Sequence, residues 1–284
     1  MEPLFNQPNS TQHLMADSSC LLSDFIAKKL ILEESHISNL FSLGSIFVNK
    51  KRVFIDQPLF PSDYIRVHTH PKRYEVEAID WRNRVIFEKD NFILINKPTG
   101  VPVHATLDNC IENVSYQLSR FLGYPLFVTQ RLDVAVSGLL ILAKTPQFQS
   151  DFNRYLSLRR VTKHYHALTQ FQPKLGIHTH FMEKSPWAPK VLSSESSPNR
   201  LQCDLEILSS IQLGNIFDSC IHLITGRTHQ IRAQLSFLNC PILGDSTYGG
   251  ILGDYSTRNI ALHSSFLAFK DFEFALPPNW KISN

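Results

Sequence analysis

The N-terminal quarter of the chain has the hydrophobic pattern of a small two-helix unit. Apolar residues at helical spacing form two stretches, namely Leu22, Phe25, Ile26 and Leu30, and then Ile37, Leu40 and Phe41. Gly44 follows the second stretch, where a glycine can adopt the positive φ that ends a helix. Apolar runs on either side of Asn49-Lys50-Lys51-Arg52 predict a hairpin, and Tyr64-Ile65-Arg66-Val67-His68 predicts a further strand. We therefore expect residues 20–74 to fold as one unit.

The rest of the chain alternates between apolar runs and helical stretches, which predicts a second, larger unit over residues 85–284. The expected strands lie at residues 92–95, 126–128, 139–142, 165–168, 205–208 and 220–224. Helices are expected at residues 111–121, 146–158 and 228–238. Residues 172–200 are rich in Pro and Ser and predict a loop, whereas the charged residues 75–84 predict a linker.

Composition excludes several classes of protein. The 284 residues include 28 Lys and Arg against 25 Asp and Glu, and the net charge of +3 is too small for a polycationic tail protein. Hydrophobic residues make up 43% and charged residues 19%, which is enough for packed cores and too apolar for general disorder. No apolar run reaches the ~18 residues of a membrane-spanning helix, so we expect a soluble protein with no membrane contact.

The N-terminus and the cysteines favour a cytoplasmic location. Residues 1–19 are polar and lack both a basic leader and an apolar core, so we expect a flexible terminus and no signal or transit peptide. The five cysteines are scattered and form no Cys-x-x-Cys pair. This pattern favours free thiols in a reducing compartment over disulfides or a zinc site.

A candidate catalytic carboxylate lies between two predicted strands. In Val128-Thr129-Gln130-Arg131-Leu132-Asp133, a strand gives way to a polar loop, and a near-continuous apolar strand follows from Ser137. Rigid structure on both sides would hold Asp133 in place, as a reactive group requires. On its own, the segment is also consistent with Asp133 as an ordinary turn or salt-bridge residue.

A candidate partner for an anion precedes the last predicted helix. In Ile224-Thr225-Gly226-Arg227-Thr228, Gly226 permits a tight turn after the strand, and Thr228 is expected to cap the helix. Arg227 would then lie at the positive end of the helix dipole, where a cation is unfavourable unless an anion is near. The alternative interpretation of Arg227 is a surface salt bridge.

Basic residues gather around the predicted hairpin and the strand after it. They are Lys50, Lys51, Arg52, Arg66, Lys72 and Arg73. Several cations on one face bind phosphates without reading sequence, although a basic hairpin tip is also common as an ordinary solvated surface. The two helices, followed by Gly44-Ser45-Ile46-Phe47-Val48-Asn49 and Asp63-Tyr64-Ile65-Arg66-Val67, resemble the small RNA-binding domain named after ribosomal protein S-four. The resemblance implies that these basic residues bind RNA.

Five motifs between Phe92 and Gly249 resemble the RluA-type pseudouridine synthases and occur in that family's order. They are Asn96-Lys97-Pro98-Thr99-Gly100-Val101-Pro102-Val103-His104, Arg131-Leu132-Asp133 followed by Ser137-Gly138-Leu139-Leu140-Ile141-Leu142-Ala143-Lys144-Thr145, Lys163-His164-Tyr165-His166-Ala167, Thr225-Gly226-Arg227-Thr228-His229-Gln230-Ile231-Arg232, and Pro241-Ile242-Leu243-Gly244-Asp245-Ser246-Thr247-Tyr248-Gly249. The resemblance implies an α+β fold with a mixed, mainly antiparallel sheet, flanking helices and a central cleft. It also implies an isomerase that converts uridine in RNA to pseudouridine.

The same resemblance assigns roles to four residues. Asp133 corresponds to the family's essential aspartate, and Tyr165 to the aromatic residue that stacks on the target base. Arg227 corresponds to the arginine paired with the aspartate, which would keep the carboxylate ionised and oriented. Arg131 corresponds to the arginine that helps displace the target nucleotide from its stack.

The implied reaction needs few chemical groups. It breaks the bond from uracil N1 to the ribose and joins C5 to the same sugar carbon, with no redox change, so we expect no metal and no organic cofactor. An ionised Asp133 could attack the sugar carbon as a nucleophile or remove a sugar proton to give a glycal. The target base must first leave the RNA stack, at a cost of about a few kcal/mol.

Departures from the family pattern support a second hypothesis. Gln130 stands where the family usually has His, and Val134-Ala135-Val136 replaces a common Arg-x-Thr stretch. These neighbours orient the loop and contact substrate, so the alternative is an RNA-binding or RNA-chaperone relative of the same fold that has lost turnover. The intact set of Asp133, Tyr165 and Arg227 favours the enzyme.

Three His-x-His pairs raise the further hypothesis of a metal-dependent hydrolase. The pairs are His68 and His70, His164 and His166, and His178 and His180. No carboxylate or cysteine stands at a supporting spacing, and strand alternation produces such pairs by chance, so we expect no metal site. The predicted partner is ribosomal or transfer RNA, and the protein is expected to be a monomer.

Overall fold

The computed structural model describes residues 11–251 and 259–280, which belong to two compact units. The first unit takes in the chain up to residue 79 together with residues 104–120, and the second takes in residues 80–103 and those from 121 onward. The first unit therefore includes a segment that the sequence pattern assigned to the larger one. Among the described residues, no helix is both long and apolar enough to cross a membrane.

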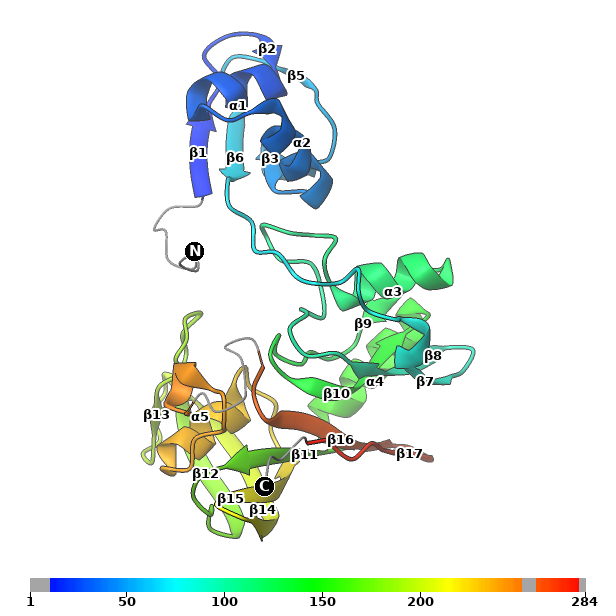
Figure 1. Ribbon diagram of the computed structural model, residues 1–284, viewed down its shortest axis with the longest axis vertical. Helices are drawn as coiled ribbons and strands as arrows, with labels where there is room; N and C mark the ends of the chain where they lie inside the picture. The colour runs from blue at the N-terminus through cyan, green and yellow to red at the C-terminus, as the bar shows by residue number, and fades with distance from the viewer. Residues whose placement is uncertain (1–10, 252–258, 281–284) are drawn as a thin grey trace. The chain divides into compact units, whose positions relative to one another are not determined.

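The first unit packs two helices against one face of an antiparallel sheet of order β1-β6-β3-β4 (Figure 1). Its elements are β1 (Thr11–Met15), β2 (Cys20–Leu21), α1 (Leu22–Leu30), α2 (Glu34–Leu43), β3 (Ile46–Val48), β4 (Lys51–Val53), β5 (Pro58–Leu59) and β6 (Tyr64–His68). The helices bury their apolar stripes, including Phe25 and Leu40, against sheet residues such as Ile46 and Ile65. Burial of these stripes is the main driving force for the fold of this unit.

Two turns of this unit depend on residues that tolerate left-handed backbone. Gly44 has φ 65° and ends α2, with its N–H donating to the carbonyls at the end of the helix. Asn49 and Lys50, with φ 48° and 68°, connect β3 to β4 in a two-residue turn whose twist matches that of the strands. The predicted helix end at Gly44 and the predicted hairpin are confirmed.

The expectation of a flexible segment over residues 1–19 is wrong for residues 11–15. Strand β1 pairs antiparallel with β6 along its whole length, from Thr11 opposite His68 to Met15 opposite Tyr64. The strand has only five residues, and several of them are polar. Its stability therefore comes from hydrogen bonding to β6 and not from its own hydrophobic pattern. Residues 1–10 of the predicted flexible segment lie outside the described residues.

The second unit is built on one large sheet of order β13-β12-β14-β15-β11-β16-β10-β8-β7, with β17 beside β16 and β9 beside β10. Its strands are β7 (Val85–Glu88), β8 (Phe92–Lys97), β9 (Phe127–Val128), β10 (Ser137–Ala143), β11 (Val161–Thr169), β12 (Gly176–Glu183), β13 (Leu192–Ser193), β14 (Arg200–Leu213), β15 (Ile216–Leu223), β16 (Leu262–Phe269) and β17 (Phe272–Ala275). In the described part of the chain, β10 and β16 run parallel and the other pairs run antiparallel. The predicted α+β class with a mixed, mainly antiparallel sheet is confirmed.

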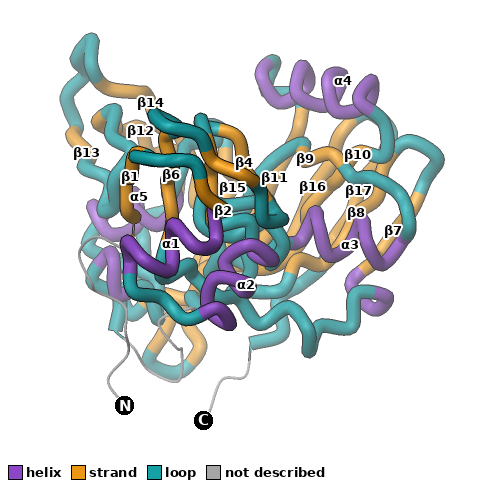
Figure 2. The backbone as a smooth tube through the Cα atoms, turned by 90° about the horizontal axis from the view of Figure 1, so that it is seen from above, coloured by secondary structure: helices purple, strands orange, loops and turns teal. Residues whose placement is uncertain are grey.

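The remaining helices are α3 (Val114–Leu122), α4 (Pro146–Ser157) and α5 (Gln230–Phe237), and short 3-10 turns lie at Arg82–Arg84 and Ser246–Tyr248. Helix α4 lies beside β9 and β10 (Figure 2) and begins where the Thr145 hydroxyl accepts a hydrogen bond from the Phe148 amide. Phe148 stacks on Phe92 and Phe152, and Phe269 packs edge-on against Phe92 and Phe152, so that the four rings form an aromatic core under this part of the sheet.

The predicted loop over residues 172–200 is wrong for residues 176–183 and 192–193, which form strands β12 and β13. Strand β12 pairs with β14 from Gly176 opposite Ile207 to Glu183 opposite Arg200. Its sequence is rich in His and Thr and carries a weak apolar pattern. The long neighbouring strand β14 therefore determines its conformation.

Candidate active site

Asp133 lies in a loop between β9 and β10, and hydrogen bonds to the backbone carbonyls of this loop hold it in place. The Lys97 ammonium donates to the carbonyl oxygens of Val134 and Val136, at 3.2 and 2.8 Å, and to that of Pro98 at 2.8 Å. The Thr99 hydroxyl donates to the intervening Ala135 carbonyl at 2.8 Å. Each of the three residues after Asp133 is therefore anchored to the end of β8, which makes the loop rigid.

Lys97 is a fully buried cation beside the candidate carboxylate. Burial lowers the pKa of Lys97 to about 7, while the negative charge of Asp133 favours the protonated amine. The three carbonyl acceptors use three hydrogens on the nitrogen, and only the ammonium form carries three. The geometry therefore opposes the desolvation cost in part, and Lys97 is charged next to Asp133 below about pH 7.

Arg232, rather than Arg227, pairs with Asp133. Its Nη1 donates to Asp133 Oδ2 at 3.2 Å, while Nε and Nη2 make a two-pronged contact with Asp245 at 2.6 and 2.8 Å. Arg232 and Asp245 are both buried. Burial opposes the charged form, but the bonds from Asp245 and the charge of Asp133 raise the pKa of Arg232, so this cation is permanent.

Arg227 is exposed, and among the described ion pairs none joins it to Asp133. The predicted pairing of Arg227 with Asp133 is thus wrong, and the reason is the position at which α5 begins. The helix starts at Gln230, with His229 at its N-cap, and Thr228 makes no capping bond. The first turn therefore directs Arg232 toward Asp133 and leaves Arg227 in the loop before the helix.

The buried Gln230 side chain fixes the turn before α5. Its oxygen accepts from the Thr225 hydroxyl and from the Arg227 amide, both at 2.9 Å. Its nitrogen donates to the Asp204 carbonyl and to the Gln234 side chain. These bonds satisfy the buried Gln230 amide group and link residues 225–227 to a helix whose first six residues are all buried.

The two oxygens of Asp133 have different surroundings. Oδ2 accepts from Arg232 and lies 3.7 Å from Nε2 of His229. Within the described parts of the chain, no side chain bonds Oδ1. The carboxylate, which is about one quarter exposed, is thus held through Oδ2, and no hydrogen bond from a described side chain occupies Oδ1.

Tyr165 lies on β11 and is buried. Burial raises the pKa of Tyr165, and the charge of Asp133 raises it further, so the phenol is neutral near neutral pH. Tyr165 pairs with Ser264 on β16, and Ser264 pairs with Gly138 on β10, the strand that follows the Asp133 loop. Arg131 is exposed in the loop that carries Asp133.

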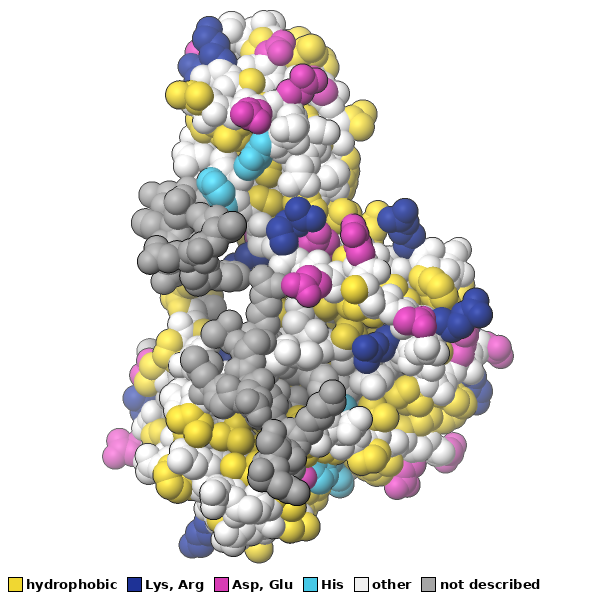
Figure 3. Space-filling model, in the orientation of Figure 1, with side chains coloured by type: hydrophobic (Ala, Val, Ile, Leu, Met, Phe, Trp, Pro, Cys, Tyr) yellow, Lys and Arg dark blue, Asp and Glu magenta, His cyan; other side chains and the backbone are white. Residues whose placement is uncertain are grey.

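The six predicted RNA-binding residues of the first unit fall into two groups. Lys50, Lys51, Lys72 and Arg73 are exposed, whereas Arg52 and Arg66 are partly buried and lie over the Phe47 ring at 4.8 and 4.1 Å. Arg52 also donates to the carbonyls of Gly44 and Thr106. On the face drawn in Figure 3, the Lys and Arg side chains of this unit form small separate groups among apolar and acidic ones.

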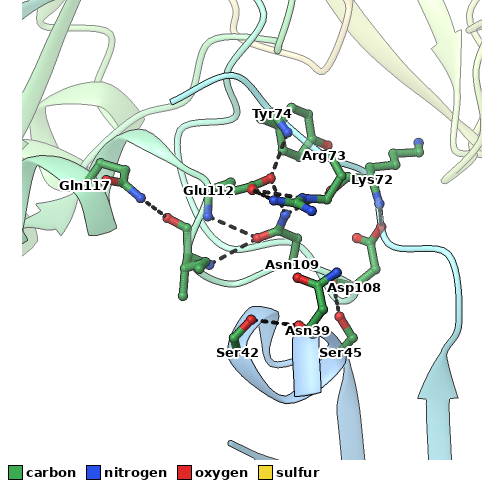
Figure 4. Close-up of polar contacts among 11 residues, drawn as sticks. Asn39, Ser42, Ser45, Lys72, Arg73, Tyr74, Asp108, Asn109, Glu112 and Gln117 are labelled. Carbon is green, nitrogen blue, oxygen red and sulfur yellow. Dashed lines mark hydrogen bonds and ion pairs between the residues drawn. The ribbon is translucent and has the colours of Figure 1, made fainter. Parts of the chain in front are cut away.

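Arg73 makes a structural contact within the first unit. Its guanidinium donates twice to Glu112 Oε1, at 2.9 and 2.6 Å, and the other carboxylate oxygen accepts from the Tyr74 amide and the Asn109 side chain (Figure 4). The Lys72 amide donates to Asp108 at 2.7 Å. These hydrogen bonds link residues 72–74 to residues 108–112, and Glu112 largely neutralises the charge of Arg73.

The histidine pairs do not form a metal site in the described part of the chain. No group of three or more His, Cys, Asp and Glu side chains there is arranged to hold a metal ion. His166 instead pairs with Asp218 at 2.8 Å, and this bond and a hydrogen bond with Cys220 raise the pKa of His166 to about 9.

Several residues at the site were not predicted from sequence, although all of them lie within the quoted motifs. They are Lys97, His229, Gln230, Arg232, Asp245 and Tyr248. Two features of the sequence could have identified Lys97 and Arg232 as site residues. Lys97 ends an apolar strand, and Arg232 lies on the apolar stripe of a helix, so both charges are expected to be buried and to need partners.

The sequence also matches known proteins. The family model described as RNA pseudouridylate synthase matches residues 91–237, which is more than half of the chain. An uncharacterized RNA pseudouridine synthase of Helicobacter pylori is 30% identical over 88% of this chain and 82% of that protein. The chloroplastic RNA pseudouridine synthase 6 of Oryza sativa is 30% identical over 87% of this chain and 66% of that protein. This chain spans about two thirds of the length of the rice relative.

A solved structure agrees with these matches. Human RNA pseudouridylate synthase domain containing 1 is 26% identical, with a TM-score of 0.54 over 72% of this chain and 86% of that one. The chain belongs to the RNA pseudouridylate synthase family. The family and the enzyme class predicted from the motifs are confirmed.

Proposed function

We propose that this protein isomerises specific uridines in ribosomal or transfer RNA to pseudouridine, with Asp133 as the essential catalytic group. The observation that carries the proposal is the asymmetry of the Asp133 carboxylate. Arg232 holds Oδ2, and the carbonyl-anchored loop fixes the backbone, so Oδ1 can be presented to the ribose of a flipped nucleotide. Placement of this kind suits both the nucleophilic and the glycal route.

The reaction balances without a cofactor. The bond between uracil N1 and ribose C1′ breaks, and the detached base turns. A bond from C5 to C1′ then forms, and the hydrogen on C5 is lost as a proton while N1 gains one. In the nucleophilic route Asp133 bonds C1′ and is later displaced by C5, whereas in the glycal route it takes a proton from the neighbouring sugar carbon and returns it.

The other side chains hold the reacting groups. We propose that the Tyr165 ring stacks on the detached uracil and that its hydroxyl assists removal of the C5 proton. Arg131, exposed on the Asp133 loop, is proposed to fill the space that the flipped base leaves. Lys97 and Arg232 act on the position of Asp133 and are positioning residues in this scheme.

The first unit is proposed to bind RNA as an S-four-like domain. Its exposed lysines Lys50, Lys51 and Lys72 can approach phosphates. Arg52 and Arg66 lie on strands β4 and β6 of the same unit. The enzyme is further proposed to act as a monomer in the cytoplasm without a metal ion.

Asp133→Asn tests the catalytic proposal. This change keeps the shape of the side chain and removes its charge, so we expect turnover to fall by more than about a thousandfold while RNA binding is retained. Because the reaction releases the C5 hydrogen, RNA labelled with tritium at uracil C5 reports turnover as tritium in water. Ribosomal RNA and transfer RNA are tested separately, with Asp151→Asn, an exposed aspartate on α4, as the matched control.

The outcomes separate the hypotheses. Turnover by Asp133→Asn within a few-fold of the wild type would show that another group is catalytic. If the wild type binds RNA but releases no tritium from either RNA, the non-enzymatic relative of the same fold is the correct description.

A further inference from the structure

A line of polar contacts runs from the segment between β12 and β13 to the candidate carboxylate. The backbone amide of Lys190 donates to the Tyr248 hydroxyl at 2.9 Å. The same hydroxyl lies 3.1 Å from Nδ1 of His229, and Nε2 of that imidazole lies 3.7 Å from Asp133 Oδ2. We call Lys190, Tyr248 and His229 the relay.

The direction of each bond follows from which groups carry hydrogens. A backbone amide can only donate, so the Tyr248 oxygen is the acceptor in its bond with Lys190. The hydroxyl has one hydrogen of its own, and His229 Nδ1 is the acceptor that the described residues offer it. If the hydroxyl gives this hydrogen to Nδ1, the neutral imidazole carries its own hydrogen on Nε2, the nitrogen that faces Asp133.

The surroundings favour this neutral form of the imidazole. Burial lowers the pKa of His229, and the charge of Asp133 opposes this effect only in part. The charged groups that face His229 are Asp133, Arg232, Asp245 and Lys190. A neutral imidazole with its hydrogen on Nε2 can donate to Asp133 without adding a charge beside Arg232.

The backbone at His229 is held in an uncommon conformation. With φ 57° and ψ 21° the residue is left-handed, and no side-chain bond caps the helix that starts after it. Such a conformation is strained for a residue other than glycine and persists where the surroundings fix it, often at functional sites. Here the conformation places the ring edge-on against Tyr248, with centroids 5.8 Å apart, and aims Nε2 at Asp133.

We propose that His229 is a positioning residue for Asp133, and that Tyr248 sets the tautomer through which it acts. The proposal rests on the catalytic role of Asp133 proposed above. The Nε2–H and the Arg232 guanidinium together orient the carboxylate through Oδ2 and present Oδ1 to the substrate. The distance of 3.7 Å shortens to a hydrogen bond when RNA closes the site, as catalytic contacts do in substrate complexes.

A double-mutant cycle tests the relay through turnover. Tyr248→Phe keeps the ring that lies over Arg232 and removes the hydroxyl, so kcat is expected to fall about three- to tenfold while KM stays within about twofold. His229→Leu is expected to cost at least as much, and Tyr248→Phe added to it should have no further effect. His229→Gln, which retains an N–H donor of similar reach, should restore part of the loss. Equal and additive losses, or equal losses for Leu and Gln, would mean that Tyr248 and His229 only pack.

A second measurement is independent of turnover. Long-range nitrogen–proton correlation spectra of the histidine rings distinguish the two neutral tautomers. We expect the Nε2–H form for His229 in the wild type and a mixed or Nδ1–H form in Tyr248→Phe. An Nδ1–H form in the wild type, or no change in the variant, overturns the relay even if Asp133 is confirmed as catalytic. A wild type without turnover would contradict the proposed function, and the spectra would still decide the tautomer.

Discussion

The two groups of basic residues in this protein differ in what surrounds them. In the second unit, Lys97 and Arg232 are buried and each makes three hydrogen bonds to fixed acceptors. In the first unit, Lys50, Lys51 and Lys72 are exposed. The buried cations hold the loop and the carboxylate of Asp133, whereas the exposed ones face solvent.

Physical chemistry gives the two groups different functions. A buried charge is tolerated when it is paired and hydrogen-bonded, so its position is defined and small changes disturb the site. An exposed lysine retains its side-chain freedom and contributes to binding mainly through counterion release. Substitutions should therefore act on turnover in the first case and on salt-dependent affinity in the second.

Among substitutions of the basic residues, the largest effect is expected from Arg232→Lys. The variant keeps the charge but loses the planar fork that joins Asp133 to Asp245. We expect kcat to fall about 100-fold, because the carboxylate is no longer held in place, with little change in RNA affinity. Tritium release and a binding titration on the same RNA measure the two effects.

Arg227→Lys is the matched control, since it makes the same change five residues earlier on an exposed side chain. Its kcat should stay within about threefold of the wild type. A larger fall in kcat for Arg227→Lys than for Arg232→Lys would show that Arg227, the arginine first predicted from the motif, pairs with Asp133 in the RNA complex.

A smaller, pH-dependent effect is expected from Lys97→Met. The change removes three bonds to the Asp133 segment, and kcat should fall about tenfold. The folded pKa of Lys97 is lowered to about 7, whereas the unfolded value is about 10.4, so the unfolded chain binds more protons between these pH values. The free energy of unfolding of the wild type should therefore rise relative to Lys97→Met above pH 7, by at most about 1.4 kcal/mol per pH unit.

Urea unfolding of both proteins at pH 6, 7.5 and 9 measures this difference. Below pH 7 the difference should be constant, because both states of the wild type then carry the proton. A difference that stays constant up to pH 9 would mean that Lys97 keeps its proton in the folded protein throughout the range.

The fold was predictable where apolar residues dominate a segment. The stripes of α1, α2 and α4 and the buried strands β8 and β10 have the expected periods, and all were predicted close to their observed bounds. Strands β1 and β12 were missed because their residues are polar or mixed, and their conformation comes from pairing with β6 and β14. Pairing between distant segments is a tertiary effect that local patterns do not contain.

The site was predictable in its position but not in its partners. The motif that contains Arg227 also contains Arg232, and sequence spacing places both near the start of a helix. Which of them reaches Asp133 depends on the residue at which α5 begins. The Gln230 network shifts that start two residues beyond the predicted position at Thr228.

Arg73→Met sharpens the comparison within the first unit. Although Arg73 is more than half exposed, its partner Glu112 is buried and would lose two charge-assisted bonds. We expect a loss of about 1 to 2 kcal/mol in the free energy of unfolding, with an unchanged salt dependence of RNA binding. A lower salt slope with unchanged stability would place Arg73 with the exposed lysines.

The double variant Lys50→Gln, Lys51→Gln is expected to cause the smallest change in free energy. Its specific effect is on the salt dependence of RNA binding. If both lysines contact phosphates, the slope of log affinity against log salt should become shallower by about 1.4 on single-stranded RNA. Lys28→Gln, Lys29→Gln removes the same charge from exposed positions on α1 of the same unit. These point variants are preferable to deletion of residues 1–74, which would remove the partners of the buried Glu112. Equal slopes for the two double variants would mean that the hairpin acts only through net charge, because phosphate contacts depend on where a cation lies and overall attraction does not.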